Sequence, residues 1–420
     1  MKINQNNKLR LVLIGVNSLF YIAMSVYSPF LASYYTQQNV TPQQMGFLFA
    51  IGPVVTIIIQ PKWAKISDYT EKRKSVLLLA VAGAGVSILF YYLAHGFLGF
   101  FLVTALFSCF STALLPLSDA IVVPLSGKSH FNYAYIRMGG TIGYAITVYL
   151  AGFVIKTHPG ILFLLGACMY FVMMLIVLQL PRDSGSVKKK TSGGKAVIEK
   201  KDRVSTTVTE KRTCKKIKPA VTKIFQSKEA YFVLGFAFIY QIGMSFASGF
   251  LGAYIIKLGY SQKVIGIANS ISAFSEVPIL IFIDRLVRKF GIMKMVAFSC
   301  LMTAVRIFCI SSGVLPIIML SQLLQSVTYM TTYFCCVTYI SKNVLPGKQA
   351  QGQSILAKLQ TGVAGIMGYL GGGYILDRIG YQRTYFLFSA VVFVAGMVNY
   401  LLYFLYQNRK LLVCRLHEKQ

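Results

Sequence analysis

Residues 114–146 read LLPLSDAIVVPLSGKSHFNYAYIRMGGTIGYAI, and this stretch decides the fold. Two apolar runs flank a short polar turn, and each run carries a single charge, Asp119 in the first and Arg137 in the second. A charge at bilayer depth costs at least ~2.5–3.5 kcal/mol, so such residues usually face a polar cavity. Arg137 follows Asp119 by 18 residues, which fits a hairpin of two helices that brings both side chains together. The stretch predicts a membrane hairpin with a functional pair.

A second pair has the same character. Glu276 lies in ANSISAFSEVPILIF, residues 268–282, and Arg306 lies in SCLMTAVRIFCISSG, residues 299–313. The same cost of burying a charge applies to both. For each pair, a permanent structural ion pair is the alternative to a functional one. A carboxylate and a guanidinium at the midplane can also accept a polar solute between them, since one offers acceptors and the other donors.

The composition supports a membrane protein. The chain has 420 residues, of which 55% are hydrophobic, and its mean hydropathy is +0.62. This is too apolar for an ordinary soluble domain. The net charge is +30, but the basic residues lie between apolar runs, so they favour a role in membrane topology over binding of nucleic acid. The first apolar run begins near Leu9 and lacks a clear cleavage site, so we expect it to be the first span and not a signal peptide.

Neither an enzyme nor a metal site is indicated. The eight cysteines show no CxxC or Cys/His metal spacing. We find no nucleophile–base set and no phosphate-binding loop. We therefore expect no enzymatic activity, no metal and no cofactor, and take a proton gradient as the driving force.

The apolar segments predict an all-α membrane protein. A helix needs about 20 mostly apolar residues to cross the hydrocarbon core, and by this criterion we expect about twelve spans. They begin near Leu9, Gln44, Ser75, Leu98, Ala134, Gly160, Ala230, Gln262, Met293, Leu315, Gln351 and Gln382.

A polar, basic segment divides the spans into two groups of six. We expect an N-terminal six-helix bundle over 1–180, a basic cytoplasmic linker over 181–228, a C-terminal six-helix bundle over 229–408, and a cytoplasmic tail over 409–420. The linker is either simply solvated or in contact with anionic lipid headgroups. Loops rich in Lys and Arg alternate with loops poor in them, and the positive-inside rule then places both termini in the cytoplasm.

A short loop carries the first resemblance to a known family. QPKWAKISDYTEKRKSVL, residues 60–77, joins the second and third predicted spans. It resembles the characteristic loop of the major facilitator superfamily, with Asp68, Arg73 and Lys74 at the matching positions. The resemblance implies the twelve-helix major facilitator fold. It also implies that these three residues form a cytoplasmic gate that latches the two halves.

The resemblance is closer to the lactose permease branch, with its related nucleoside and phenylpropionate permeases. VYSPFL at 26–31 and IQPKWAKISD at 59–68 are similar to strings of that branch, and residues 114–146 are the most specific match. The resemblance places Asp119 on the sugar-binding carboxylate, Arg137 on the arginine paired with it, and Tyr144 on the aromatic that stacks on the sugar.

The second half agrees more loosely with the same branch. Glu276 resembles its eighth-span carboxylate and Arg306 its ninth-span arginine. GGGYILDRIGYQRTYFLFS, residues 371–389, resembles the connection between its last two spans. The Lys, His and Glu of the family's tenth span have no counterpart in QLLQSVTYMTTYF, residues 322–334. Lactose as the substrate, and the family's way of coupling protons, are therefore in doubt.

We accordingly expect a secondary transporter that works by alternating access. The leading hypothesis is a proton-coupled symporter of a small polar organic solute, with a saccharide or nucleoside first. The alternatives are an organic-acid permease, a proton-antiport exporter of drugs or metabolites, and a non-transporting receptor or scaffold. We also expect a monomer in the bacterial cytoplasmic membrane, whose partners are the solute, protons and membrane lipid, with no nucleic acid.

Glu276 and Asp119 are the only carboxylates placed deep in the membrane, so by elimination they are the candidates for proton coupling. Lys358 is either a further site cation or a side chain that extends to the interface. The residues expected to line the substrate site together with the two charged pairs and Tyr144 are Gln241, Gln322, Gln325, Tyr21, Tyr27, Tyr240 and Tyr329.

Overall fold

The computed structural model describes residues 2–417, except 71, 129–130, 132, 156–159, 182–223 and 346–347. Within these ranges the chain is helical and forms no strand, apart from an isolated bridge between Phe225 and Val344. Apolar helices suit a bilayer because each helix satisfies its backbone hydrogen bonds internally. The predicted all-α class is confirmed.

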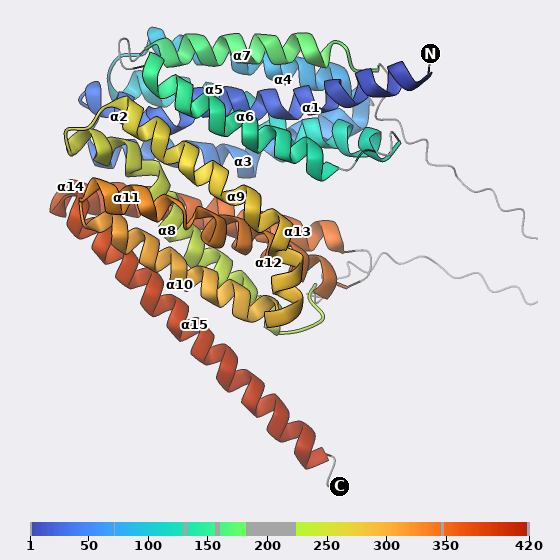
Figure 1. Ribbon diagram of the computed structural model, residues 1–420, viewed down its shortest axis with the longest axis vertical. Helices are drawn as coiled ribbons and strands as arrows, with labels where there is room; N and C mark the ends of the chain where they lie inside the picture. The colour runs from blue at the N-terminus through green and yellow to red at the C-terminus, as the bar shows by residue number, and fades with distance from the viewer. Residues whose placement is uncertain are drawn as a thin grey trace, which may run out of the picture.

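The helices form two halves, which lie one above the other in Figure 1. The helices of the first half are α1 (Lys2–Tyr27), η1 (Ser28–Phe30), α2 (Leu31–Gln37), α3 (Pro42–Thr70), α4 (Arg73–Ser87), η2 (Ile88–Tyr92), α5 (Gly96–Lys128), α6 (Tyr133–Val154) and α7 (Ile161–Val177). Those of the second are α8 (Glu229–Lys257), α9 (Gln262–Phe290), α10 (Ile292–Ser311), α11 (Leu315–Gln322), η3 (Ser326–Met330), α12 (Thr331–Asn343), α13 (Gln349–Ala357), η4 (Lys358–Ala364), α14 (Gly365–Ile379) and α15 (Tyr381–His417).

Seven helices of the described chain are long and apolar enough to cross a membrane on their own, and an eighth joins them if the bent α9 counts as one span. Of the other segments, α7 is shorter, and those formed by α11 with α12 and by α13 with α14 are interrupted. Two of them contain π-helical turns, η3 between α11 and α12, and η4 between α13 and α14. Such turns interrupt the regular hydrogen-bond ladder and often occur at functional sites.

The two faces of the bundle differ. We call the face near the chain ends and the loop between α3 and α4 the terminal face, on the right in Figure 1. The opposite face holds the turns between α2 and α3, between α8 and α9, and between α14 and α15. Gly380 forms the last of these turns with φ of 78°, a conformation that glycine adopts without steric cost.

The two halves touch closely near the opposite face. A Cβ placed on Gly46 of α3 would lie 2.5 Å from the carbonyl oxygen of Tyr369 and 3.3 Å from the Cα of Gly373 in α14. Gly152 of α6 and Gly266 of α9 approach each other in the same way, with such a Cβ on Gly266 lying 3.1 Å from the Cα of Gly152. Small residues let helices of a membrane protein pack this closely.

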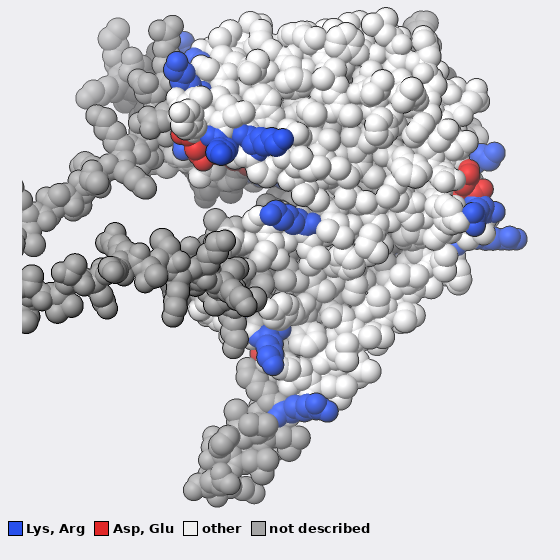
Figure 2. Space-filling view, turned by 180° about the vertical axis from the view of Figure 1, so that it is seen from behind, with Lys and Arg blue, Asp and Glu red and all other residues white. Residues whose placement is uncertain are grey.

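A hydrogen bond strengthens the same contact. The hydroxyl of Ser33 in α2 donates to Oε1 of Gln262 at the start of α9, at 2.8 Å, and both residues are buried. Figure 2 shows the halves meeting without a gap on the side of the opposite face, with a notch between them on the other side. In this conformation the halves are therefore held together at the opposite face.

Two predicted segments flank the second half, the expected linker at residues 181–228 and the expected tail at residues 409–420. Most of the expected linker, residues 182–223, lies outside the described residues. Its last residues are tied to the second half, because Leu345 N–H donates to the Ile224 carbonyl at 3.0 Å and Gln226 N–H donates to the Asn343 carbonyl at 2.9 Å. The expected start of the tail at 409 falls inside α15, which continues to His417.

Candidate functional site

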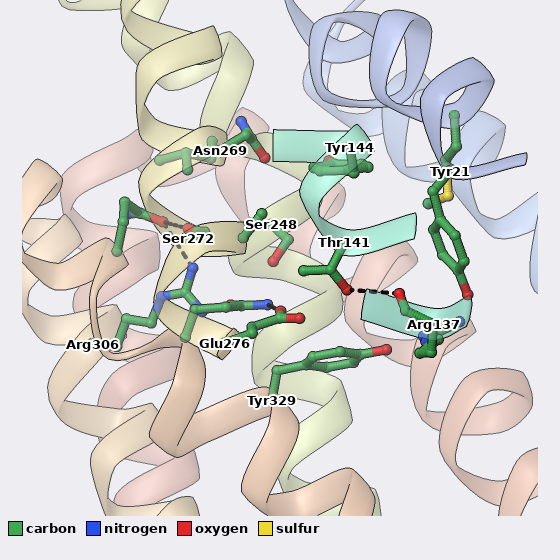
Figure 3. Close-up of a pocket in the computed structure, with 15 residues that line it drawn as sticks. Tyr21, Arg137, Thr141, Tyr144, Ser248, Asn269, Ser272, Glu276, Arg306 and Tyr329 are labelled. Carbon is green, nitrogen blue, oxygen red and sulfur yellow. Dashed lines mark hydrogen bonds between the residues drawn. The ribbon is translucent and has the colours of Figure 1, made fainter. Parts of the chain in front are cut away.

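A cavity of about 220 Å³ lies between the two halves, and its lining comes from both. α1 and α6 contribute from one side, and α8, α9, α10, α11 and the segment from Gln325 into η3 from the other (Figure 3). The volume is below the ~300–1,000 Å³ typical of sites for drug-sized ligands, so this conformation suits a small solute. The polar side chains of the lining are Tyr21, Arg137, Thr141, Tyr144, Ser248, Asn269, Ser272, Glu276, Arg306, Gln322, Gln325 and Tyr329.

Arg306 forms the buried end of a polar chain in the second half. Only 4% of this residue is exposed, and its guanidinium donates to Oε1 of Gln322 at 2.8 Å and to Oε1 of Gln325. The amide of Gln325 in turn donates to Oε1 of Glu276 at 3.2 Å. Ser272 holds Gln322 by a further hydrogen bond of 3.0 Å. These hydrogen bonds connect the guanidinium of Arg306 to the carboxylate of Glu276 through the neutral amide of Gln325.

Arg137 faces this chain from the first half. Its guanidinium lies over the ring of Tyr21, 4.4 Å from the centroid, a cation–π contact that holds the charge at the cavity wall. Arg137 and Arg306 both lie within electrostatic range of Glu276. The residues predicted in separate halves of the chain therefore share one cavity.

The predicted ion pairs need correction. The ion pair recorded among the described residues joins Asp68 and Arg73, and no carboxylate of this part of the chain lies within 4 Å of the guanidinium of Arg137 or Arg306. Glu276 and Arg306 are connected through Gln325 instead of touching. Asp119 and Arg137 are not connected by a hydrogen bond in the described chain. Arg137 shares its cavity with Glu276 of the other half.

Asp119 lies outside the cavity lining. It accepts a hydrogen bond of 2.8 Å from the hydroxyl of Tyr133, and the carbonyl of the next residue, Ala120, accepts one of 3.2 Å from Arg73 near the terminal face. Tyr133 is the first residue of α6, so this hydrogen bond holds Asp119 beside the start of that helix. Arg137 lies about one helical turn further along α6 and faces the cavity.

Of the other residues predicted to line the site, Tyr144, Gln322, Gln325, Tyr21 and Tyr329 do so. Tyr329 lies on the π-helical turn η3. Figure 3 shows its ring on the side of the cavity where Glu276 and Arg137 lie.

The remaining predicted residues lie elsewhere. Gln241 donates to the Ser245 hydroxyl on its own helix at 2.9 Å and is not part of the lining. Tyr240 is buried close to Arg306, and Tyr27 shares a hydrogen bond of 3.2 Å with Tyr170.

Lys358, the further candidate cation, is exposed on η4. It lines a separate pocket of about 230 Å³ between α3 and η4, with Gln60 and Thr361 nearby.

Sequence reasoning missed several small polar residues of the lining, among them Thr141, Ser248, Asn269 and Ser272. Asn269 and Ser272 lie in the same quoted stretch as Glu276. Ser272 follows Asn269 by three residues and Glu276 follows Ser272 by four, so the three side chains share one helix face. That spacing was a usable signal, although serine and threonine are common in membrane helices for packing alone.

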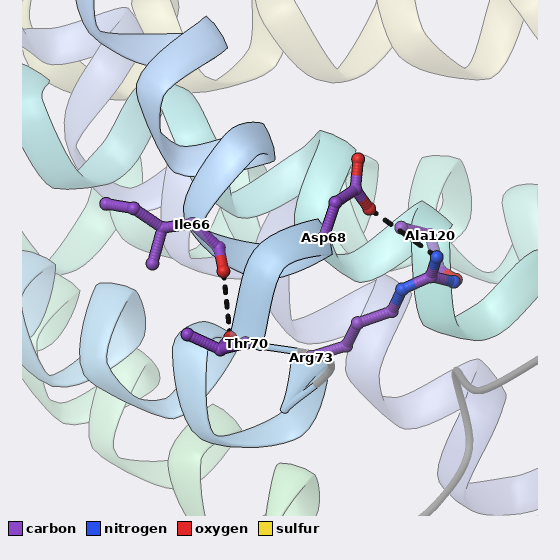
Figure 4. Close-up of polar contacts among 5 residues, drawn as sticks. All are labelled: Ile66, Asp68, Thr70, Arg73 and Ala120. Atoms are coloured by element: carbon purple, nitrogen blue, oxygen red, sulfur yellow. Dashed lines mark hydrogen bonds and ion pairs between the residues drawn. The ribbon is translucent and has the colours of Figure 1, made fainter.

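The residues of the predicted cytoplasmic gate flank the turn between α3 and α4, with Asp68 in the last turn of α3 and Arg73 and Lys74 at the start of α4. Figure 4 shows Asp68 and Arg73. Arg73 lies 3.5 Å from Asp68 and donates to the Ala120 carbonyl of α5 at 3.2 Å. Lys74 donates to the carbonyls of Leu178 and Leu180 at 2.7 and 2.6 Å. These contacts all lie within the first half, so in this conformation they brace its terminal face. No ion pair from Asp68 or Arg73 to the second half is present in the described chain.

Comparisons with known proteins agree with this architecture. The model of the MFS_1 like family matches residues 11–388. An uncharacterized transporter, YwbF of Bacillus subtilis, is 24% identical over 88% of this chain and 86% of its own length. A maltose permease of Geobacillus stearothermophilus is 23% identical over 91% of this chain and 92% of its own length.

Among solved structures, a single-residue mutant of the nucleoside transporter NupG superposes with a TM-score of 0.78. The alignment covers 93% of this chain and 98% of that one at 15% identity, which shows a shared fold. The family match spans most of the chain, and the fold and the cavity between two halves agree with it. The chain belongs to the MFS_1 like family and is an integral membrane transporter of the major facilitator superfamily, not an enzyme.

Proposed function

We propose that this transporter is a proton-coupled symporter that carries a small polar organic solute, with saccharides and nucleosides as the first classes to test. The names of the maltose permease and of the nucleoside transporter NupG support these classes. The alternation of basic and neutral loops supports a bacterial cytoplasmic membrane location with both termini in the cytoplasm. We further propose that the protein works as a monomer.

One observation carries the proposal: Glu276 is the carboxylate of the cavity lining in the described chain. Proton coupling needs a group that gains and loses a proton during the cycle, and a carboxyl between a hydrophobic interior and two movable guanidiniums meets this need. Asp119 is the second candidate, but its hydrogen bond to Tyr133 places it outside the lining. The groups within electrostatic range of Glu276 are Arg137 of α6, Arg306 of α10, Tyr144 of α6, Tyr240 of α8 and Tyr329 of η3.

Alternating access then follows from the two halves. The glycine contacts Gly46–Gly373 and Gly152–Gly266 close the opposite face in this conformation. Rocking of one half against the other would open these contacts and close the terminal face around the same cavity. Arg137 and Glu276 lie on different halves, so this motion changes their separation and with it the preference of Glu276 for a proton.

The test is uptake by the purified full-length protein in proteoliposomes, with radiolabelled maltose, glucose and uridine. We expect at least one solute to accumulate when the outside is made acidic and not when the pH is equal on both sides. Glu276→Gln keeps the hydrogen-bonding shape but removes the titratable group, so it should allow exchange of solute across the membrane without accumulation. If the unaltered protein accumulates a solute equally well with and without the pH gradient, the proposal is wrong.

A further inference from the structure

The charges of the cavity do not balance. Its lining in the described chain holds two guanidiniums, Arg137 and Arg306, and one carboxylate, Glu276. The cavity therefore has a charge of +1 when Glu276 is ionised and +2 when it is protonated. Asp119, the carboxylate that would have balanced the second arginine, is hydrogen-bonded to Tyr133 outside the lining.

Neither guanidinium is satisfied by a carboxylate of the described chain. Arg306 is 4% exposed, and its terminal nitrogens donate to the neutral amide oxygens of Gln322 and Gln325. Its buried Nε has no hydrogen-bond acceptor among the described residues. Arg137 rests on the ring of Tyr21, and no described carboxylate lies within 4 Å of it. A buried cation without a counter-ion is costly, and amide dipoles or a ring offset only part of that cost.

We propose that the solute supplies the missing negative charge: the cavity binds a small organic monoanion whose carboxylate lies between Arg137 and Arg306. The planar guanidinium of Arg137 matches a carboxylate with two parallel hydrogen bonds, which a neutral sugar hydroxyl cannot reproduce. Arg306, whose terminal nitrogens already donate to Gln322 and Gln325, contributes its charge. The remaining polar lining, including Asn269, Ser272 and Thr141, suits hydroxyl groups on the rest of the solute. This inference rests on the transport function proposed above and narrows its substrate to hydroxylated or otherwise polar carboxylic acids.

The charge balance also gives the inference a second support. With the monoanion bound, the three side chains and the solute carry a charge of zero when Glu276 is ionised and +1 when it is protonated. A neutral solute would leave +1 and +2 in the same two states. The monoanion therefore lowers the charge at the bilayer midplane in both states, where an uncompensated charge is costly.

The experiment uses two matched pairs of probes, glucuronate with glucose and 3-phenylpropionate with 3-phenylpropan-1-ol. Within each pair the solutes differ in the acid group. Uptake of each radiolabelled probe is measured under an inward pH gradient in proteoliposomes of the full-length protein, and uptake by protein-free liposomes under the same gradient is subtracted. We expect the acid of at least one pair to be taken up about tenfold or more faster than its neutral partner, the effect of one or two charge-assisted hydrogen bonds.

The variant Arg137→Gln tests the origin of the preference, with Arg378→Gln as its matched control. Both arginines stack on a tyrosine, Arg137 on Tyr21 at 4.4 Å and Arg378 on Tyr374 at 4.0 Å, but Arg378 is not part of the lining. Arg137→Gln should remove the preference for the acid, and Arg378→Gln should keep it. A monodisperse elution profile and an unchanged melting temperature confirm that both variants are folded.

The outcomes separate this inference from the transport proposal. If the neutral partner is taken up at least as fast as the acid in both pairs, the anion inference is overturned and the symporter still stands. A preference for acids that survives Arg137→Gln also overturns it, because the arginine is then not the receptor for the charge. If none of the four probes, nor maltose or uridine, is taken up by folded protein, the proposed function itself is wrong.

Discussion

The amide nitrogen of Gln325 donates a hydrogen bond to Oε1 of Glu276 at 3.2 Å. The oxygen of the same amide accepts from the guanidinium of Arg306, so a neutral side chain separates two charges that the sequence alone would have paired directly. This amide makes Glu276 sensitive to the position of η3, the π-helical turn that follows Gln325. Movement of η3 during transport would change the hydrogen bond between Gln325 and the carboxylate of Glu276.

Removing this amide should impair transport. Gln325→Leu removes the hydrogen bond to Glu276 and leaves Nη1 of Arg306 with only long contacts, 3.5 Å to the Thr328 hydroxyl and 3.8 Å to the sulfur of Met244. A buried group left unsatisfied costs about 1–3 kcal/mol. We expect gradient-driven uptake in proteoliposomes to fall about tenfold or more. Gln43→Leu, at an exposed glutamine near the start of α3, is the control and should transport normally. Normal uptake by Gln325→Leu would show that the amide has no part in the cycle.

The two candidate carboxylates should differ in a direct comparison. Glu276 lines the cavity, whereas Asp119 is bonded to Tyr133 outside it. Glu276→Gln should therefore abolish accumulation driven by the pH gradient, while Asp119→Asn should retain the greater part of it. The measurement is solute accumulation as a function of the imposed pH difference. The reverse ranking would identify Asp119 as the coupling group.

A bulky residue at the opposite face should shift the conformation. Gly373→Leu places a side chain where a Cβ already lies 2.5 Å from the Pro42 carbonyl oxygen, so the halves must separate there. Gly371→Leu is the matched control, two residues away on α14, because a Cβ at Gly371 meets nothing within 4 Å. The reporter is Ser33→Cys, at a residue that is buried between the halves.

We expect Gly373→Leu to raise the rate at which maleimide labels Cys introduced at position 33, and to slow transport. Labelling of the protein that retains Ser33 measures the reaction of the native cysteines and is subtracted. Gly371→Leu should do neither. Equal labelling in the two glycine variants would mean that the opposite face does not open at this contact.

The loop charges should matter little for stability. Asp68 is 73% exposed and Arg73 27% exposed, and exposed ion pairs contribute only about 0–1 kcal/mol. Asp68→Asn should therefore leave the melting temperature of the detergent-solubilised protein within a few degrees of the original. If these residues nevertheless act as a gate, the same variant will slow uptake while remaining equally stable. A large loss of stability would instead assign the loop a structural role.

Membrane potential offers a test of charge stoichiometry. Uptake of one monoanion with one proton moves no net charge, whereas a neutral solute with one proton moves one positive charge. If glucuronate or 3-phenylpropionate is carried, a potassium diffusion potential, negative inside, should leave its initial uptake rate unchanged at fixed pH gradient. Strong acceleration by the potential would indicate a different ratio of protons to solute.

The structural class of this protein, and most of the polar residues that line its cavity and carry a charge, could be predicted from the amino-acid sequence. Long apolar runs can satisfy their backbone only as helices in a bilayer, so the all-α membrane fold follows from composition and length. The rarity of charges in those runs was enough to single out Arg137, Glu276 and Arg306, all of which line one cavity. Resemblance added Tyr144, which lines it as well.

The pairing of the charges could be read only from the folded protein. Spacing along the chain suggested Asp119 with Arg137, but spacing does not determine which side chain each charge meets, and here Asp119 is hydrogen-bonded to Tyr133 while Arg137 lines the cavity. Spacing along the chain also carries no information on contacts between helices that are distant in sequence. Such contacts bring Arg137 of the first half to the cavity of Glu276, and place Gln325 between Glu276 and Arg306 in the second half. Because electrostatic energy depends on distance in space and not along the chain, the excess positive charge of the cavity became visible only in the folded protein.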